Sequence, residues 1–256
     1  MRRALCLPIV ALLALLAWAP SASAAPVPGP DQLAVPFDRS HFVAAIRDAS
    51  VPEASEIDRH LFALSPDNKR LRRRDGPRRR EVLAVAVITT ETFDKYYASG
   101  SGTTPASKPV LWVTLAPQLR DWCRHLRRSL REKAERLRER VVQRLGLSPT
   151  TPYDKVVELW VDPAKVFRPC PDPGPGDASC ELEMDGSPQV EGVADYPSFF
   201  ASLYVGAYRT EGAPWTRLGY TYDWGGRKEF GASEYMLTTS ARYEVRTAGS
   251  VSGYCD

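Results

Sequence analysis

The stretch EVLAVAVITT, residues 81–90, decides the fold of this chain. From Val82 to Thr90 it is almost continuously apolar and rich in β-branched side chains. This pattern predicts a strand that is central in its sheet and buried on both faces. The segment before it, KRLRRRDGPRRR at 69–80, contains almost no apolar residues and has Asp-Gly-Pro at its centre. That composition predicts a solvated turn that leads into the central strand.

Further strands are predicted on both sides of the central one. They lie at 60–64, 110–115, 156–161, 218–224, 233–238 and 243–247. Short helices are predicted at 41–49 and 197–208, and helices and strands alternate without a βαβ rhythm. We therefore expect a single α+β domain at 41–256, built on a mainly antiparallel sheet. A Pro-rich leader at 25–40 precedes it.

One long amphipathic helix is predicted to pack on this sheet. Between residues 119 and 145, apolar residues recur at steps of three and four, and a glycine at 146 ends the pattern. The helix should bury one set of side chains and expose another, namely Leu126, Leu130 and Leu137 against Arg127, Arg131 and Arg138.

The N-terminus predicts export. Arg2 and Arg3 precede an apolar run at 5–18, and the small residues at 22–24 are typical of a cleavage site. Residues 1–24 are therefore expected to be a signal peptide, and the protein is expected to be periplasmic or secreted. The apolar run is short for a hydrocarbon layer of about 30 Å. No later stretch is long and apolar enough to predict a membrane span.

The charge distribution bears on the class of partner. The chain carries a formal net charge of +3, and loss of Arg2 and Arg3 with the signal leaves it nearly neutral. Basic residues gather at 69–80 and 117–146, and such clusters attract anionic polymers. Nucleic acid is not an expected partner outside the cell. The expected partner is an envelope or extracellular ligand: a glycan, a peptide or an anionic polymer.

Four cysteines remain after removal of the signal, and an even number in an exported chain predicts disulfides. Cys170 and Cys180 flank the loop PDPGPGDAS, which a local bridge would close. That pairing leaves Cys123 to bond with Cys255. Zinc is the alternative, but the chain has no CxxC spacing and its histidines are scattered.

The densest group of aromatic residues is PWTRLGYTYDWGG at 214–226, called here the aromatic segment. In a strand, its side chains would alternate between two faces, with Leu218, Tyr220, Tyr222 and Trp224 on one and Arg217, Thr221 and Asp223 on the other. The aromatic face either fills the core or lines a groove, because rings suit sugars and peptide side chains.

A cleft would satisfy the polar tips of these aromatic residues more easily than a core would. We therefore expect the aromatic segment, with the returning strand up to residue 235, to form one wall of the largest pocket. This unit is called the aromatic hairpin. At least one of its four candidate ligand-binding residues should be partly exposed there, namely Trp215, Tyr220, Tyr222 or Trp224. The leading hypothesis is a non-catalytic binding module that uses this hairpin.

The alternative hypothesis is a carboxylate-dependent glycan hydrolase. A hairpin turn through GGRKEFGA, residues 225–232, would bring Glu234 beside Asp223. Two neighbouring carboxyls repel, so one of them would have the raised pKa that acid–base chemistry requires. Arg217 completes this candidate catalytic set, and Glu234 is its expected partner.

Other chemistries have little support in the sequence. A Gly-rich phosphate loop, a GxSxG motif and a Cys-His arrangement are all absent, so no cofactor is expected. The acidic residues in and after the bridged loop make calcium an alternative: Asp172, Asp177, Glu181, Glu183 and Asp185. Their spacing lacks the alternation of an EF-hand, so a solvated loop without metal is the expectation.

Three segments carry a resemblance to other proteins. They are WVTLAPQLRDWC at 112–123, VELWVDPAKVFRPCPDP at 157–173 and PWTRLGYTYDWG at 214–225, followed by GASEYML at 231–237. Together they are similar to a recurring pattern in a family of exported bacterial proteins of unassigned function. The resemblance implies a self-contained module with this cysteine framework. It does not include the leader or the arginine-rich turn.

Overall fold

The structure is a computed structural model that describes residues 39–76, 80–107, 109–129 and 134–256. The predicted signal peptide and nearly all of the leader lie outside these ranges. The strands are β1 (Arg73–Asp75), β2 (Arg80–Thr89), β3 (Ser101–Thr103), β4 (Leu111–Leu115), β5 (Tyr153–Val161), β6 (Val166–Phe167), β7 (Tyr220–Tyr222), β8 (Phe230–Ser233), β9 (Tyr235–Leu237) and β10 (Arg242–Ser250). The helices are α1 (Arg39–Ala49), α2 (Thr90–Tyr96), α3 (Gln118–Ser129), α4 (Ala134–Arg144), α5 (Tyr196–Ala207) and α6 (Val251–Tyr254).

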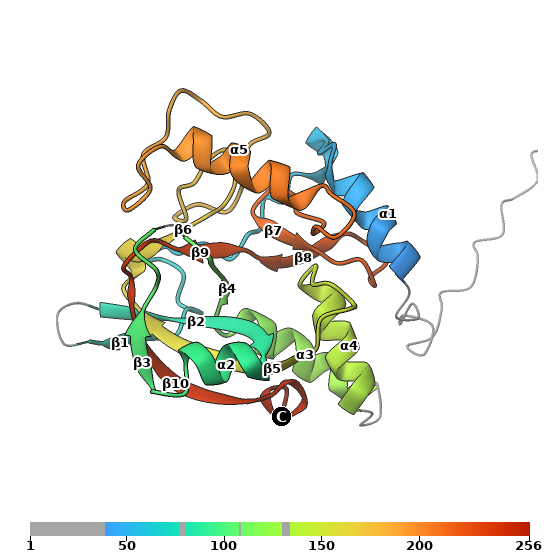
Figure 1. Ribbon diagram of the computed structural model, residues 1–256, viewed down its shortest axis with the longest axis vertical. Helices are drawn as coiled ribbons and strands as arrows, with labels where there is room; N and C mark the ends of the chain where they lie inside the picture. Colours follow the sequence, from blue (N-terminus) through green and yellow to red (C-terminus); the bar gives the residue numbers. More distant parts are fainter. Residues whose placement is uncertain (1–38, 77–79, 108, 130–133) are drawn as a thin grey trace, which may run out of the picture.

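A curled sheet forms the centre of the protein (Figure 1). Its strands run in the order β3–β10–β5–β2–β4–β9–β6, with β1 paired to β2, and β7 and β8 form a separate two-stranded sheet. All pairings in the described ranges are antiparallel. The predicted α+β class with an antiparallel sheet is confirmed.

The predicted central strand is β2, which pairs with β5 on one side and with β4 on the other. Val82, Ala84 and Ala86 face a core enclosed by the curl of the sheet. Leu83 and Val85 face a second core, where α3, α4 and α6 cover the sheet. Burial on both faces explains why this strand has a continuous apolar run instead of an alternating one.

The second core contains one of the two disulfides. Cys123 of α3 bonds to Cys255, which follows α6, with 5.4 Å between their Cα atoms. The other bridge joins Cys170 to Cys180 across 6.4 Å. Both predicted pairings are confirmed.

The expected single long helix is not shown. The structure has two shorter helices, α3 and α4, and residues 130–133 between them lie outside the described part of the chain. Leu137 is buried as predicted, whereas Leu126 and Arg138 are both half-buried instead of buried and exposed. The side-chain predictions for Arg127, Leu130 and Arg131 lie outside what the structure describes. Gly146, whose φ of 63° is favourable only for glycine, follows α4 as expected.

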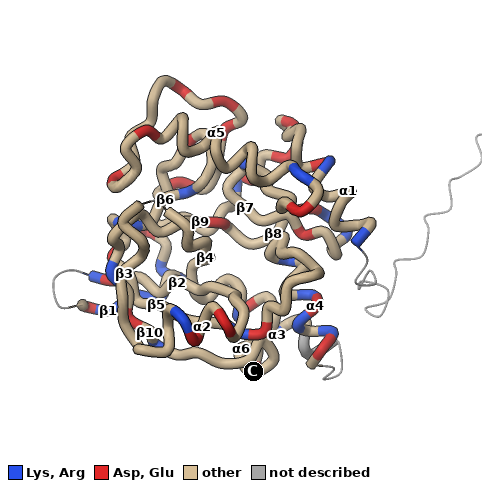
Figure 2. The backbone as a smooth tube through the Cα atoms, viewed as in Figure 1, with Lys and Arg blue, Asp and Glu red and all other residues tan. Residues whose placement is uncertain are grey.

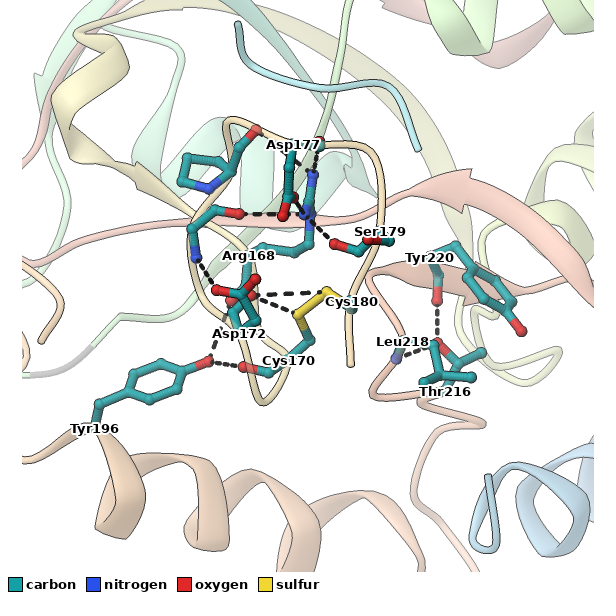
Figure 3. The surroundings of a disulfide bond; sticks show 12 residues. Arg168, Cys170, Asp172, Asp177, Ser179, Cys180, Tyr196, Thr216, Leu218 and Tyr220 are labelled. Carbon is teal, nitrogen blue, oxygen red and sulfur yellow. Dashed lines mark hydrogen bonds and ion pairs between the residues drawn. A yellow bond between two sulfur atoms is a disulfide. The ribbon is translucent and has the colours of Figure 1, made fainter. Parts of the chain in front are cut away.

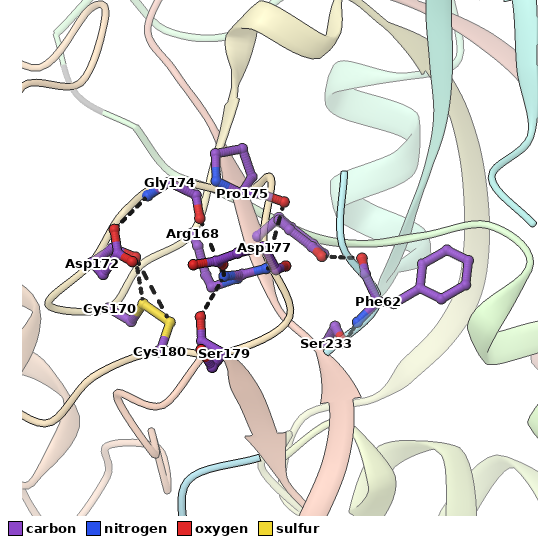
Figure 4. Close-up of polar contacts among 11 residues, drawn as sticks. Phe62, Arg168, Cys170, Asp172, Gly174, Pro175, Asp177, Ser179, Cys180 and Ser233 are labelled. Atoms are coloured by element: carbon purple, nitrogen blue, oxygen red, sulfur yellow. Dashed lines mark hydrogen bonds and ion pairs between the residues drawn. A yellow bond between two sulfur atoms is a disulfide. The ribbon is translucent and has the colours of Figure 1, made fainter. Parts of the chain in front are cut away.

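The predicted strand at 60–64 is also wrong. This segment is irregular, although Leu61 and Phe62 are buried. The Leu61 amide donates to the carbonyl of Ala178 at 3.0 Å, and the Phe62 amide donates to Ser233 Oγ at 2.7 Å (Figure 4). The first acceptor is a backbone carbonyl in a loop, and the second is a side-chain oxygen of β8. These two hydrogen bonds therefore do not form a β-ladder.

A second layer covers the other side of the molecule. Figure 1 shows α1 and α5 on one side of the β7–β8 pair, with α2 and α3 on the opposite side of the molecule. Phe42 of α1 packs edge-on against Trp224 at 5.7 Å, and Tyr196 of α5 packs against Phe167 of β6 at 6.0 Å. Aromatic contacts therefore hold this layer to the sheet.

The bridged loop at 170–180 is organised by a buried arginine (Figures 3 and 4). Arg168 is fully buried, and its guanidinium donates to Asp177 Oδ1 at 2.7 Å. It also donates to the carbonyls of Gly174, Asp177 and Ser179, at 3.2, 2.9 and 2.8 Å. The carbonyls of this loop thus turn inward toward a guanidinium.

The calcium alternative finds no support in this arrangement. Figure 2 shows acidic positions spread along the loop that leads to α5. Within the described ranges, no cluster of three or more histidine, cysteine, aspartate or glutamate side chains is arranged to hold a metal ion. Within the same ranges, no helix has the length and apolar character needed to cross a membrane.

Candidate functional site

A cavity of about 720 Å³ lies between the sheet and the layer that contains α5. Its walls come from β2, β4 and β5 on one side, and from α5 and the aromatic hairpin on the other. Most of the lining side chains are apolar, including Val85, Ile88, Val113, Leu203 and Ala207. This volume is within the range that small-molecule sites occupy.

Three large apolar side chains are both exposed and part of the cavity wall. They are Tyr96, Val110 and Trp112, whose exposed fractions are 52, 44 and 37%. Large apolar residues grouped at a concave surface are typical of a ligand site, whereas scattered ones need no explanation. These three residues therefore mark the mouth of the cavity.

Glu234 is the buried carboxyl of the cavity wall, and its backbone is fixed on both sides. It lies between β8 and β9, and its amide donates to the carbonyl of Gly219 at 2.9 Å. Before it, the Ser233 amide donates to Gln118 Oε1 at 2.9 Å. After it, the hydroxyl of Tyr235 donates to the Phe62 carbonyl, and the Arg168 guanidinium lies over its ring at 5.6 Å.

Burial raises the pKa of Glu234 well above its ordinary value, because an ionised carboxylate is poorly solvated there. The nearby indole of Trp215 opposes this rise. Glu234 Oε2 and Trp215 Nε1 are both fully buried. Glu234 and Trp215 therefore form a buried pair in the wall of the cavity.

Neighbouring wall hydroxyls are already bonded. Thr104 Oγ1 donates to the Thr238 carbonyl at 2.6 Å and accepts from the Ala241 amide at 2.8 Å. Thr221 Oγ1 donates to the Arg144 carbonyl at 2.7 Å and accepts from the Ala232 amide at 2.9 Å. These two hydroxyls are therefore occupied by the backbone.

The aromatic hairpin contributes two of its four candidate aromatic residues to the cavity. Trp215 and Tyr222 both line it, and Tyr222 is half-buried. Tyr220 and Trp224 lie in the core instead, where their polar tips are bonded to the backbone. Tyr220 donates to the Glu56 carbonyl at 2.9 Å, and Trp224 donates to the Leu147 carbonyl at 3.1 Å. The core thus satisfies two of the four groups. The hydroxyl of Tyr222 donates to Asp48 Oδ2 at 2.7 Å, so its polar tip is bonded as well.

Asp223 does not form the expected pair with Glu234. Arg140 donates to both Asp223 oxygens at 3.0 and 3.1 Å, and Arg144 reaches Oδ2 at 3.5 Å. No carboxylate contributes to the raised pKa of Glu234. The register explains this separation, since Ser233 pairs with Tyr220 and Phe230 pairs with Tyr222 across an irregular ladder.

Arg217 is not the partner of Glu234 either. Its guanidinium donates to the Ser50 carbonyl at 2.9 Å and lies over the rings of Tyr204 and Tyr208, at 4.9 and 5.4 Å. Its φ of 62° is in the left-handed region, which breaks the strict alternation of a strand. Arg217 therefore points away from the expected partner and joins the aromatic hairpin to α5.

Sequence reasoning missed the opposite walls of the cavity. Trp112 lies on β4 between the buried residues Leu111 and Val113, and a tryptophan on the opposite face of that predicted strand was the usable signal. Gly206 and Ala207 supply the wall from α5, and nothing in their local sequence distinguishes them from ordinary helix residues. No protein-family model, curated protein or solved structure matches this chain.

Proposed function

We propose that this protein binds a small, largely apolar molecule in the cavity, as a non-catalytic module that works outside the cytosol. The predicted signal peptide supports export, and the two disulfides agree with an oxidising compartment. The aromatic hairpin forms one wall of the site, and Glu234 with Trp215 supplies its polar end.

The observation that carries this proposal is the exposed apolar mouth at Tyr96, Val110 and Trp112. Covering apolar surface stabilises a complex by about 25 cal/mol for each Å² removed from water. A ligand that enters here would bury both the mouth and the apolar interior. The lining offers few free hydrogen-bonding groups, which favours an apolar ligand over a glycan or an anionic polymer.

The hydrolase hypothesis lacks a second carboxylate in this site. Glycoside hydrolysis needs two carboxyl groups on either side of the scissile bond. Asp223 is neutralised by Arg140 and Arg144. Glu211 lines the cavity too, but it is exposed and paired with Arg39. Glu234 has the raised pKa that a general acid requires, but it has no partner for this reaction in the described part of the chain.

Fluorescence titration with the apolar probe N-phenylnaphthylamine tests the proposal. Wild-type protein should enhance the emission of the probe saturably. Val110→Asp places a charge at the mouth and should weaken binding at least about tenfold, because charged groups are costly in an apolar site. Val51→Asp is the matched control: Val51 is also an exposed valine, but it does not line the cavity. Absence of binding, or equal loss in both variants, would refute the proposal.

A further inference from the structure

We propose that the ligand carries a flat aromatic ring, which stacks on the indole of Trp112 at the mouth of the cavity. This inference rests on the proposed function and adds the chemical class of the ligand. It starts from Trp112 itself, which lies on β4, lines the cavity and exposes 37% of its surface. An indole that stays this exposed at a concave surface keeps a large apolar area for a ligand to cover.

The position of Trp112 is fixed before any ligand arrives. Its strand lies between β2 and β9 in the sheet, and Trp112 pairs with the fully buried Met236 of β9. A side chain on a rigid strand loses little conformational freedom when a ligand binds, so more of the contact energy appears as affinity. Trp112 is therefore a preorganised surface for a ring.

Two indole rings meet at this point of the wall. The ring centroids of Trp112 and Trp215 lie 6.2 Å apart, with 82° between the ring planes. Trp215 is buried and also contacts the rings of Phe200 and Tyr208. Trp112 has Trp215 as its ring neighbour among the described residues, and the rest of its surface is open to the cavity mouth.

This arrangement favours a flat ring over a saturated one. A ligand ring parallel to Trp112 would be nearly perpendicular to Trp215, and stacked and edge-to-face are the two arrangements that aromatic rings prefer. Such pairs add affinity beyond the apolar area that they bury. A saturated ring of the same skeleton has no π-system, so it would gain the area contribution alone.

Other aromatic side chains of the cavity offer less free surface. Four tyrosines of the wall pack into the cores on either side: Tyr97, Tyr153, Tyr222 and Tyr243. Tyr96 is exposed at the mouth, but the ammonium group of Lys95 lies over its ring at 5.1 Å. The stacking position is therefore assigned to Trp112.

A sugar ring can also lie on an indole, but it fits this cavity less well. Each sugar hydroxyl that leaves water needs a hydrogen-bond partner inside the site. The wall hydroxyls are already engaged. Thr104 and Thr221 bond to the backbone, Thr114 donates to Gln118 Oε1 at 3.2 Å, and Ser202 donates to a carbonyl of its own helix at 2.6 Å.

A cationic ligand also fits less well. Cations are attracted to the face of an indole, but an ion that enters a largely apolar cavity loses its hydration. The exposed carboxylate of the lining, Glu211, already pairs with Arg39. A neutral aromatic ring meets neither cost.

The test compares four ligands by titration calorimetry on the intact protein: β-naphthol, decahydro-β-naphthol, methyl glucoside and tetramethylammonium. The first two share a carbon skeleton and a hydroxyl group, and differ in being flat and aromatic or saturated. The saturated compound has at least as much apolar surface, so area alone predicts equal or tighter binding for it. Instead, β-naphthol should bind at least about threefold more tightly, which is the effect of one aromatic pair.

Variants of Trp112 identify the ring responsible. Trp112→Leu keeps an apolar side chain without a ring, so it should abolish the preference for β-naphthol, and Trp112→Met provides the same test if that variant does not fold. Trp112→Phe retains a ring and should retain the preference. Tyr204→Leu is the matched control, because Tyr204 is an aromatic residue with 43% exposure that does not line the cavity. It should bind both compounds as the wild type does.

Each outcome has a definite meaning. Equal binding of the two naphthol compounds, or a preference that survives in Trp112→Leu, would overturn the stacking inference. Tighter binding of methyl glucoside or tetramethylammonium than of β-naphthol would overturn it in favour of a sugar or a cation. If N-phenylnaphthylamine binds while β-naphthol has no advantage over its saturated analogue, this inference fails and the proposed function stands. If no apolar probe binds, both fail.

Discussion

Two buried carboxyls, Asp223 and Glu234, lie in the aromatic hairpin and differ in their neighbours. Asp223 accepts hydrogen bonds from two arginines and from the amide of Gly225. Glu234 has the indole of Trp215 beside it, and burial raises its pKa. The same chemical group is therefore part of an ion-pair network at one position and a carboxyl of raised pKa at the other.

Removal of the Asp223 carboxylate should affect stability more than binding. Asp223→Ala leaves Arg140 buried without its anion, and breaking a buried ion pair costs about 3–5 kcal/mol. Urea unfolding followed by circular dichroism measures this loss. The control is Glu211→Ala, which removes an exposed ion pair and should cost much less. A similar small loss in both variants would show that Asp223 is not a structural anion.

The raised pKa of Glu234 gives folding a dependence on pH. In the unfolded chain this group titrates near pH 4.3, roughly its ordinary value, whereas in the folded protein it stays protonated to higher pH. Its contribution is complete below the unfolded pKa and is lost as pH rises through the folded pKa. Wild type should therefore lose stability relative to Glu234→Gln above about pH 4.3, by at most about 1.4 kcal/mol per pH unit.

Urea unfolding of wild type and Glu234→Gln over a series of pH values provides the measurement. Tyr208 lies near this region, and burial raises its pKa further from that range, so the difference between the two proteins isolates Glu234. Parallel curves for the two proteins would mean that the Glu234 side chain is solvated in the folded state.

At the scale of elements, the sequence was most informative where a periodic pattern agreed with burial. The run at 82–90 predicted β2 and its central position, because a strand covered on both faces must be apolar throughout. The two cysteine pairs were also predictable, since one pair flanks a short loop and the other then follows.

Elements fixed by distant partners were not predictable. Residues 60–64 are held by Ala178 and Ser233, more than a hundred positions away along the chain, and no local pattern reports such partners. The same holds for Arg168, which was unremarkable in the sequence yet organises the bridged loop from a fully buried position. For the candidate site, Glu234 and Trp215 were named in advance, but their facing wall on β4 and α5 was not.

The two disulfides should stabilise the fold by different amounts. The bridge Cys123–Cys255 spans 132 residues and Cys170–Cys180 spans 10. Loop-closure entropy predicts stabilisation of about 5 and about 3 kcal/mol respectively. Paired Cys→Ala substitutions, compared by urea unfolding, should therefore be more damaging for the first bridge. A larger loss at Cys170–Cys180 would indicate that the Arg168 contacts depend on that bridge.

At the scale of the whole molecule, the cavity results from how two layers meet. The sheet packs against α3, α4 and α6 on one side, while α5 packs on β6 and β9 and contacts the aromatic hairpin through Phe200 and Trp215. Between them the contact is incomplete, and small residues of α5 such as Gly206 and Ala207 leave space beside β4. Because the cavity is open to solvent at Tyr96, Val110 and Trp112, ligand binding there would remove apolar surface from water.

A larger side chain inside the cavity should raise the stability of the protein and weaken ligand binding. A Cβ at Gly206 would have no atom within 4 Å, and Gly206 lies in α5 at the cavity wall. Gly206→Leu should stabilise the empty protein by about 1 kcal/mol through helix propensity, with a further gain where the side chain packs against the wall. It should also weaken binding of N-phenylnaphthylamine at least about tenfold, because a filled site excludes the ligand. The control is Gly206→Ala, which should gain the helix contribution and retain probe binding. Thermal unfolding and probe titration measure both quantities, and a stabilised Gly206→Leu variant with unchanged affinity would place the ligand elsewhere.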